Sequence, residues 1–456
     1  MGETQIVHAH AAPASSAEGT GRASTVLYAS LIALGIASLI LLIVDLRSDA
    51  INPLATIAVV YMAGMLAYTW YVYMLAARFD RKRRNESWPA YEDELVAVLV
   101  PCLNEEPELL GRCLHSVSSA AGRKMIVLID DGSNAETAAA MDEWSRCTGF
   151  SLVRFPENRG KREALYAAVK RLPPEVRFVV TIDSDTILDR DAIVRVVRPL
   201  KHDKVVAATG DVQLLNERSN FLTRMIASYY WIGLHLYKAA QSSINSVTCC
   251  SGCLAAYRRE TLDSIIDAFA NQRFLGKACT HSEDRHLTNL CLKDGNSVVF
   301  VPDAISITET PDTVRRFVRQ QMRWKRGYMR ESIFTLTHAW RRKRLLFMQV
   351  ALWELTEPFV TLGLRIGVVL MIFTHASVFV FALLPIWLFV GVVRNVLLVA
   401  SVPEKLPGML GYMLFYEVVL YWVNVWALLT VSKSGWLTRG GNEEPQVYEA
   451  AVPAAL

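Results

Sequence analysis

The segment 178–185, FVVTIDSD, is a run of aromatic and β-branched residues that ends in two carboxylates, Asp183 and Asp185. An apolar run of this length and composition is typical of a strand buried in a sheet. Carboxylates two residues apart can converge where the chain turns, and their oxygens suit a hard divalent cation that bridges to phosphates. Because Asp-x-Asp is common by chance, the motif gains its weight from its place at the end of a predicted strand.

Two other apolar runs end in polar turns in the same way. Residues 96–105 are VAVLVPCLNE, and residues 126–134 are IVLIDDGSN. Ligands of open parallel sheets bind at the carboxyl ends of the strands, so Asp130 is a candidate to accept hydrogen bonds from a base or a ribose. The alternative is that these Asp and Ser residues cap a following helix.

Short β-rich runs alternate with segments of helix length through residues 92–335. The runs are Leu95–Val100, Met125–Ile129, Phe178–Ile182 and Ser297–Val301. This alternation predicts an α/β domain with a largely parallel sheet and crossover helices. Nothing between residues 92 and 335 is long and apolar enough to span a membrane.

Three more motifs carry charged or aromatic side chains. Lys161 and Arg162 follow Gly160 and can approach a diphosphate, unless they form an exposed charged turn. Glu283 and Asp284, within HSEDRHLT at 281–288, either supply a general base or cap the helix that follows. Residues 320–327, QQMRWKRG, offer a stacking face and a phosphate-binding guanidinium, although alone they would pass for an amphipathic helix end.

Composition limits the class of protein. The 456 residues are 52% hydrophobic and 20% charged, which excludes a globally disordered chain. The formal net charge of +4 is too small to indicate nucleic-acid binding, and we expect no nucleic-acid partner.

Apolar stretches flank the α/β domain on both sides. The runs 24–44 and 54–76 are each long enough to cross a bilayer, and the cationic cluster 78–84 after them marks the cytoplasmic side. The resulting predicted organisation is a disordered tail 1–23, two transmembrane helices in 24–77, a cytosolic catalytic domain 92–335, an interfacial helix region 336–358, C-terminal transmembrane helices in 359–431, and a polar tail 432–456.

The C-terminal membrane region leaves two questions open. Its apolar stretches, at about 346–374, 377–399 and 408–431, would put the tail outside if all three crossed completely, so one of them can be re-entrant or split. Glu354 and Glu357 would be costly at bilayer depth, so we expect them to face protein or water.

In this order and spacing the motifs resemble glycosyltransferase family 2, in particular its processive membrane synthases. The resemblance covers about 92–335 and extends into the flanking membrane segments. It implies a GT-A fold, which is a mixed sheet that binds a nucleotide sugar, and a plasma-membrane protein of several spans whose catalytic domain is cytoplasmic. The bilayer and the growing polysaccharide would be its partners.

The resemblance also implies roles for residues on the donor side. Asp130 would contact the uracil or ribose, and Lys161 and Arg162 would face the diphosphate. Asp183 and Asp185 would hold the sugar nucleotide, with Asp185 nearest a bound Mg²⁺ or Mn²⁺.

On the acceptor side, the resemblance makes Asp284 the general base. Gln320, Arg323 and Trp324 match a Gln-x-x-Arg-Trp motif that contacts the diphosphate and the acceptor sugar. The metal and the cations would stabilise the departing UDP, and one direct displacement would convert an α-linked donor into a β-linkage.

Finer resemblances divide between two subfamilies. Segments such as 271–276 and 393–395 are similar to hyaluronan synthases, whereas 283–288 and 434–439 are similar to chitin-oligosaccharide synthases. In the tail, Trp436 and Arg439 match a Trp-Gly-Thr-Arg element, but Leu437 replaces its glycine.

The expected function is therefore synthesis of a β-linked polysaccharide, ranked first as hyaluronan made from UDP-GlcNAc and UDP-GlcA. The alternative is a chitin-oligosaccharide synthase that uses UDP-GlcNAc alone. A membrane protein that binds nucleotide sugars without catalysis ranks far below, because Asp183, Asp185 and Asp284 are all present. A transferase that adds one sugar to a lipid carrier is disfavoured by the Gln-x-x-Arg-Trp motif.

Overall fold

The computed structural model describes residues 53–85, 88–91, 93–350, 354–355, 361–362, 365–366, 373, 380 and 384–433. The predicted tail 1–23, the predicted span 24–44 and the element at 436–439 lie outside these residues. The chain divides into two compact units, which are Met1–Trp70 with Leu362–Leu414, and Tyr71–Thr361 with Phe415–Leu456.

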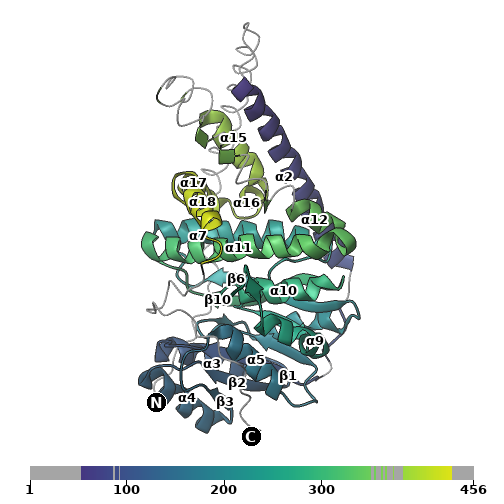
Figure 1. Ribbon diagram of the computed structural model, residues 1–456, viewed down its shortest axis with the longest axis vertical. Coiled ribbons are helices and arrows are strands. Elements are labelled where there is room, and N and C mark those ends of the chain that lie inside the picture. Colours follow the sequence, from purple (N-terminus) through teal and green to yellow (C-terminus); the bar gives the residue numbers. More distant parts are fainter. Residues whose placement is uncertain are drawn as a thin grey trace, which may run out of the picture. The chain divides into compact units, whose positions relative to one another are not determined.

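In the described residues, the second unit is built on an eight-stranded sheet of order β3-β2-β1-β4-β7-β6-β10-β5 (Figure 1). The strands are β1 (Val96–Cys102), β2 (Lys124–Asp130), β3 (Ser151–Arg154), β4 (Phe178–Thr181), β5 (Ile187–Leu188), β6 (Val205–Leu214), β7 (Ala255–Arg258) and β10 (Ser297–Thr308). The four predicted strands are confirmed as β1, β2, β4 and β10.

The sheet is mixed rather than largely parallel. Strands β3, β2, β1 and β4 are parallel, as the alternating pattern predicts, and β6 is parallel to β10. Strand β7 runs antiparallel to both β4 and β6, and β5 runs antiparallel to β10. The prediction missed β7 and β5 because they have only four and two residues and show no long apolar run.

Crossover helices cover the parallel half. Helix α3 (Pro107–Ser119) connects β1 to β2, and α5 (Lys161–Arg171) connects β3 to β4, in the opposite direction along the sheet. Because such crossovers are right-handed, α3 and α5 lie on opposite faces. The direction reverses between β1 and β4, so the carboxyl ends of these strands flank the point where open sheets bind ligands.

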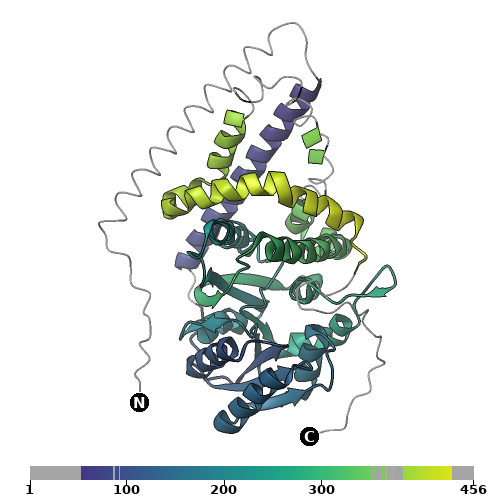
Figure 2. The same ribbon diagram turned by 90° about the vertical axis from the view of Figure 1, so that its left-hand side faces the viewer.

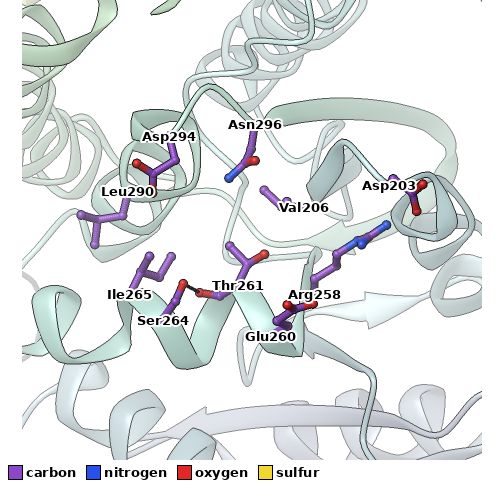
Figure 3. A pocket seen from close by; sticks show the side chains of 10 residues that line it. All are labelled: Asp203, Val206, Arg258, Glu260, Thr261, Ser264, Ile265, Leu290, Asp294 and Asn296. Atoms are coloured by element: carbon purple, nitrogen blue, oxygen red, sulfur yellow. Dashed lines mark hydrogen bonds between the residues drawn. The ribbon is translucent and has the colours of Figure 1, made fainter.

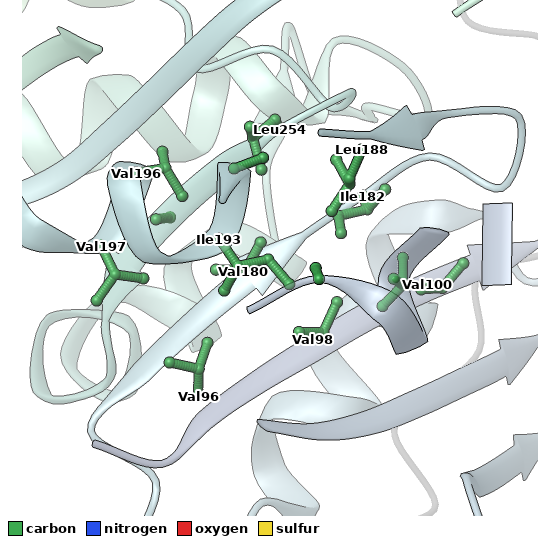
Figure 4. Close-up of a cluster of buried hydrophobic side chains, with 14 of the residues drawn as sticks. Val96, Val98, Val100, Val180, Ile182, Leu188, Ile193, Val196, Val197 and Leu254 are labelled. Atoms are coloured by element: carbon green, nitrogen blue, oxygen red, sulfur yellow. The ribbon is translucent and has the colours of Figure 1, made fainter. Parts of the chain in front are cut away.

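The core fills one face of this sheet. Val96, Val98 and Val100 of β1 alternate towards it, and they pack with Val180 of β4 and with α6 (Ala192–Val197) (Figure 4). All seven residues of β1 are buried, since helices cover both faces. Burial of β-branched side chains on a central strand therefore fixes the scaffold from which the polar strand ends project.

The other longer helices alternate with the strands along the chain or follow the last strand. They are α4 (Ala135–Thr148), α7 (Phe221–Ile232), α9 (Arg259–Ala270), α10 (Glu283–Lys293), α11 (Val314–Arg342) and α18 (Tyr421–Leu429). Helix α11 packs against α10 and against α18 (Figure 2). A two-stranded hairpin, β8 (Arg273–Phe274) with β9 (Lys277–Ala278), lies between α9 and α10.

The apolar segments are helical where they are described. Helix α2 (Pro53–Asn85) contains the predicted run 54–76 and ends in the basic residues Lys82, Arg83 and Arg84. Within the described part of the chain, one continuous helical run, Pro403–Leu429, has the length and apolar composition of a membrane span. The number of crossings therefore stays a prediction.

Candidate active site

The first candidate, Asp130, ends β2 and is almost fully buried, with 1% of its surface exposed. Its carboxylate accepts hydrogen bonds from the Ser133 backbone N–H (2.8 Å) and from Arg154 Nε (2.7 Å). The following helix is capped by Asn134, whose side chain accepts from the Thr137 N–H, so Asp130 does not serve as its cap.

Asp131, which sequence analysis did not single out, holds the loop before α5. It accepts hydrogen bonds from the backbone N–H groups of Arg159 (2.8 Å) and Gly160 (2.9 Å), and burial raises its pKa to about 6. Successive residues of a strand point to opposite faces, so the Asp-Asp pair itself could have indicated two separate roles. The structure assigns Asp131 to the loop that delivers Lys161.

The predicted Asp183–Asp185 motif forms a turn at the end of β4. The carbonyl of Asp183 accepts from the Thr186 N–H (3.1 Å), and Ser184 Oγ donates to the buried carboxylate of Glu105 (2.7 Å). These contacts leave both Asp side chains partly exposed. The hydroxyl groups of Thr186 (3.4 Å) and Thr308 (3.5 Å) both donate to Asp185 Oδ1.

Lys161 brings three carboxylates together. Its Nζ lies 2.5 Å from Asp183 Oδ1, 3.6 Å from Asp284 Oδ1 and 3.7 Å from Glu283 Oε1. Burial disfavours the ammonium ion, but Asp183 and then the other two acids raise the pKa of Lys161 well above its ordinary value. The residue therefore remains a cation at the centre of an acidic cluster, which we define as Lys161, Asp183, Glu283 and Asp284.

Asp284 lies in the first turn of α10 and is fixed from outside the helix. The backbone N–H of Gly252 donates to its Oδ2 (3.0 Å). Burial raises the pKa of Asp284 to about 6; Lys161 opposes this shift, while Glu283 and Asp183 add to it. A carboxylate with a pKa near the working pH can accept a proton efficiently. The capping alternative is not supported, because the bonded N–H belongs to another segment.

Gly252 is a second residue that sequence analysis did not place in the site. A Cβ at this position would lie 2.7 Å from Lys161 Nζ and 2.8 Å from Asp183 Oδ2. Only glycine lets the backbone approach the acidic cluster this closely. Its place in the Ser251-Gly252-Cys253 turn before β7 was the one available indication.

The structure does not bring Arg162 to the acidic cluster in the way that it brings Lys161. The guanidinium donates to the Phe269 carbonyl (2.7 Å) and to Gln272 Oε1 (2.8 Å), and it stacks on the Phe269 ring at 4.7 Å. Arg162 is 6% exposed. Its Nη1 and Nη2 groups thus bond to the end of α9 and the segment after it. Its predicted contact with a diphosphate stays untested.

The Gln-x-x-Arg-Trp residues lie on α11 near the cluster. The charge of Arg323 is among those that hold the pKa of Glu283 below its usual value against the effect of burial. The Trp324 ring lies 6.5 Å from that of Tyr230, whose pKa is raised by burial and, more weakly, by groups that include Asp185 and Asp183. Gln320 lies one helical turn before Trp324, and Trp436 and Arg439 are outside the described residues.

The side chains at the end of β4 fit a hard divalent cation, but they do not form a complete metal site. Among the residues that the structure describes, no group of three or more His, Cys, Asp or Glu side chains is placed to hold a metal ion. Mg²⁺ is commonly held by one or two carboxylates, with water and substrate phosphates in its other positions. Asp185, with Asp183 beside it, would suit that arrangement.

A separate pocket of about 280 Å³ lies at the opposite edge of the sheet, where β6 and β10 begin. Asp203, Glu260 and Asp294 are among its lining residues (Figure 3). None of the candidate site residues lines this pocket, so it is distinct from the acidic cluster.

Comparison with known proteins agrees with the fold. Residues 93–327 match the model of a family described as "Glycosyltransferase like family 2". An N-acetylglucosaminyltransferase of Mesorhizobium japonicum is 32% identical over 408 residues, which cover 89% of this chain and 94% of the relative. One from Bradyrhizobium diazoefficiens is 33% identical over 378 residues, which cover 79% of this chain and 74% of the relative.

A solved structure supports the fold assignment. The mannosyltransferase PcManGT from Pyrobaculum calidifontis, determined in complex with GDP-Man and Mn²⁺, is similar with a TM-score of 0.57 and 19% identity. The match covers 82% of this chain and 99% of the mannosyltransferase. The α/β unit therefore has the GT-A fold.

Proposed function

The chain belongs to glycosyltransferase family 2, and on this basis we propose that it transfers N-acetylglucosamine from UDP-GlcNAc to a sugar hydroxyl and builds a β-linked chitin oligosaccharide. The names of the curated relatives support this donor. The sequence motifs ranked hyaluronan synthesis first. We now rank it below chitin-oligosaccharide synthesis, because nothing in the comparisons supports UDP-GlcA as a second donor.

The observation that carries the proposal is the acidic cluster around Lys161. Asp284, fixed by the Gly252 N–H, would take the proton from the acceptor hydroxyl as that oxygen attacks the anomeric carbon. The hydroxyl oxygen forms the new glycosidic bond while the bond to the UDP oxygen breaks. A single displacement of this kind inverts the anomeric configuration and needs no covalent enzyme intermediate.

The cations would act on the leaving group and on the base. Lys161, held at 2.5 Å from Asp183, would neutralise charge near the diphosphate and keep the neighbouring carboxylates ionised. Mg²⁺ or Mn²⁺, bound near Asp185, would stabilise the negative charge on the departing UDP. Trp324 and Arg323 on α11 would orient the acceptor sugar and the diphosphate, with Gln320 one turn away.

We also propose that the protein is a membrane enzyme of several spans with a cytoplasmic catalytic unit. The span-length run Pro403–Leu429 and the cationic end of α2 support this location. Extrusion of the growing chain through the membrane part would then accompany repeated transfer.

The decisive experiment uses the full chain, purified in detergent with Mg²⁺ or Mn²⁺. UDP release and product size are measured with UDP-GlcNAc alone, with UDP-GlcA alone and with both donors. We expect a chitinase-sensitive product from UDP-GlcNAc alone. A long, hyaluronidase-sensitive polymer that forms only with both donors would replace this proposal with the hyaluronan synthase, which segments such as 271–276 resemble. No UDP release with any donor would contradict both.

A further inference from the structure

A buried carboxylate of α11, Glu331, holds the helix that carries the proposed base. Glu331 is fully buried, with 0% of its surface exposed. Its Oε2 accepts hydrogen bonds from His286 Nδ1 (3.0 Å) and Asn289 Nδ2 (3.2 Å), which both belong to α10. His286 is two residues after Asp284, so the contact acts on the same turn of helix as the base.

The other oxygen of Glu331 holds the chain that leads into α10. Its Oε1 accepts from Gln272 Nε2 (2.5 Å), and the Gln272 carbonyl in turn accepts from the Cys279 N–H. Arg330 Nε lies 3.5 Å from the same oxygen. One carboxylate thus connects α11 to α10 and to the hairpin segment before it.

Glu331 is ionised in this setting. Burial alone would raise its pKa, but the hydrogen bonds from His286 and Gln272 and the charge of Arg330 lower it to about 2. Burial lowers the pKa of His286 itself, so His286 acts here chiefly as a hydrogen-bond donor. A buried carboxylate with several donors is rigidly oriented, because each lost hydrogen bond would leave a costly unpaired group.

A second buried acid holds the residue between Asp284 and His286. Arg285 donates to Glu354 Oε2 (2.9 Å), and Ser332 of α11 donates to the same oxygen (2.9 Å). This contact also confirms that Glu354 faces protein, as its cost in a bilayer predicted. The residues immediately after the base are therefore held by carboxylates on two sides.

Stability alone does not explain such a network. Replacing buried ion pairs with apolar residues of similar volume is often neutral or stabilising, so their retention is weak evidence for a purely structural role. The same helix that carries Glu331 carries Arg323 and Trp324, the proposed acceptor-side residues. A rigid contact between α11 and α10 would fix the base relative to the acceptor.

We propose that Glu331 is a positioning residue, which holds Asp284 in line with the acceptor bound on α11 through its contacts with His286 and Gln272. This inference rests on the proposed function, because it needs Asp284 to act as the base. Displacement of the base by about 1 Å can lower a rate by roughly 100-fold without changing how the donor binds.

The experiment compares full-chain variants by kcat and KM for UDP-GlcNAc, UDP affinity and melting temperature. For Glu331→Gln we expect kcat to fall by about 10- to 100-fold, with KM and UDP affinity within about 2-fold of wild type. Asp211→Asn is the matched control, since Asp211 is a buried carboxylate of the same unit on β6, where it lies 3.9 Å from His235. This control should keep the wild-type kcat.

A pair of His286 variants tests the same contact if Glu331→Gln does not fold. Asn can offer an N–H in place of His Nδ1, so His286→Asn should keep most of the activity, whereas His286→Leu should lose about as much kcat as Glu331→Gln. If the role of His286 were only structural, both variants would lose stability, and His286→Asn would not keep more activity than His286→Leu.

The outcomes separate the two proposals. If the wild-type chain releases no UDP from UDP-GlcNAc, the proposed function fails. If the wild type is active and Asp284→Asn is not, but Glu331→Gln and His286→Leu keep kcat, then the positioning role alone is refuted. The positioning role would also be refuted if Glu331→Gln lost kcat, UDP affinity and melting temperature together and Asp211→Asn showed the same losses.

Discussion

The strand ends and the start of α10 both present carboxylates to the site, but they are built in different ways. At the strand ends the turns themselves are local, since the Asp130 carboxylate accepts the Ser133 N–H and the Asp183 backbone carbonyl accepts the Thr186 N–H. Side chains from farther along the chain, Arg154 and Lys161, then pair with these two carboxylates. Asp284 is instead fixed by Gly252, 32 residues away, and by Lys161 from α5. Turn chemistry therefore shapes the donor side, whereas tertiary packing assembles the base.

This difference predicts two classes of variant. Changes at the base and its long-range partners should lower kcat, whereas changes on the donor or acceptor surface should act mainly on binding. The variants below test that division, from the largest expected effect to the smallest.

Asp284→Asn should have the largest effect. The variant keeps the size of the side chain but removes the proton acceptor, so transfer should fall by about 100- to 10,000-fold. UDP should still bind, because the amide leaves the strand ends unchanged. UDP affinity by calorimetry and transfer by UDP release measure the two separately. Normal turnover in this variant would remove Asp284 from its role.

Lys161→Met should come next and should also change the pH dependence. In the wild type, protonation of Asp284 lowers kcat/KM as the pH falls through about 6, because burial raises the pKa of this group. Lys161 opposes that shift, so its removal should raise the pKa further and move the acidic limb to higher pH. We expect a loss of roughly 100-fold at neutral pH.

The pH profile gives this variant a sharp test. An acidic limb that stays where it is in the wild type, despite the lost activity, would show that Lys161 does not govern the ionisation of Asp284. A profile that moves to lower pH would contradict the sign of the interaction.

Gly252→Ala should lower kcat by about 10-fold or more, because the new methyl group would displace Lys161 or Asp183 from contact with the turn. Gly233→Ala is the matched control, since nothing lies within 4 Å of a Cβ built there and its φ of −56° is helical. UDP-release kinetics for both variants check the expectation, and equal rates would show that close approach at Gly252 is not needed.

The same division decides how much could be predicted from the sequence. Strands β1, β2, β4 and β10 follow from their buried apolar runs, and the Asp183–Asp185 turn follows from its place after β4. These features depend on residues that are neighbours in the chain. The reversed strand β7 could not be predicted, because its four residues carry no periodic pattern and its pairing depends on two distant strands.

Within the site, a motif could identify Lys161 and Asp284 but not their partners. No feature of the neighbouring sequence indicates a role for Glu331. In the sequence it resembles any other charged residue of an amphipathic helix, and only the structure shows that it is buried. The motifs also could not predict the donor sugar, since short segments resembled two subfamilies. Relatives compared over most of the chain were needed to favour UDP-GlcNAc.

Trp324→Ala should have a smaller effect and act on the acceptor. Loss of an aromatic contact costs on the order of 1 kcal/mol, so the KM for an oligosaccharide acceptor should rise by roughly 5- to 10-fold. UDP affinity should change little. Titration of chitin oligosaccharides at fixed UDP-GlcNAc measures the acceptor KM, and a fall in donor affinity instead would contradict the acceptor assignment.

Arg162→Met should have the smallest effect on donor binding, although it changes the residue next to Lys161. Its guanidinium satisfies the Phe269 carbonyl and Gln272, so its loss should destabilise the fold by about 1–3 kcal/mol and lower the melting temperature. Donor affinity should stay close to that of the wild type, because these contacts face α9 rather than the acidic cluster. If Arg162→Met weakened UDP binding as much as Lys161→Met, both cations would serve the diphosphate, as the motif first predicted. If instead Lys161→Met weakens UDP binding and Arg162→Met does not, then side-chain packing, rather than membership of the motif, decides which of the two cations belongs to the site.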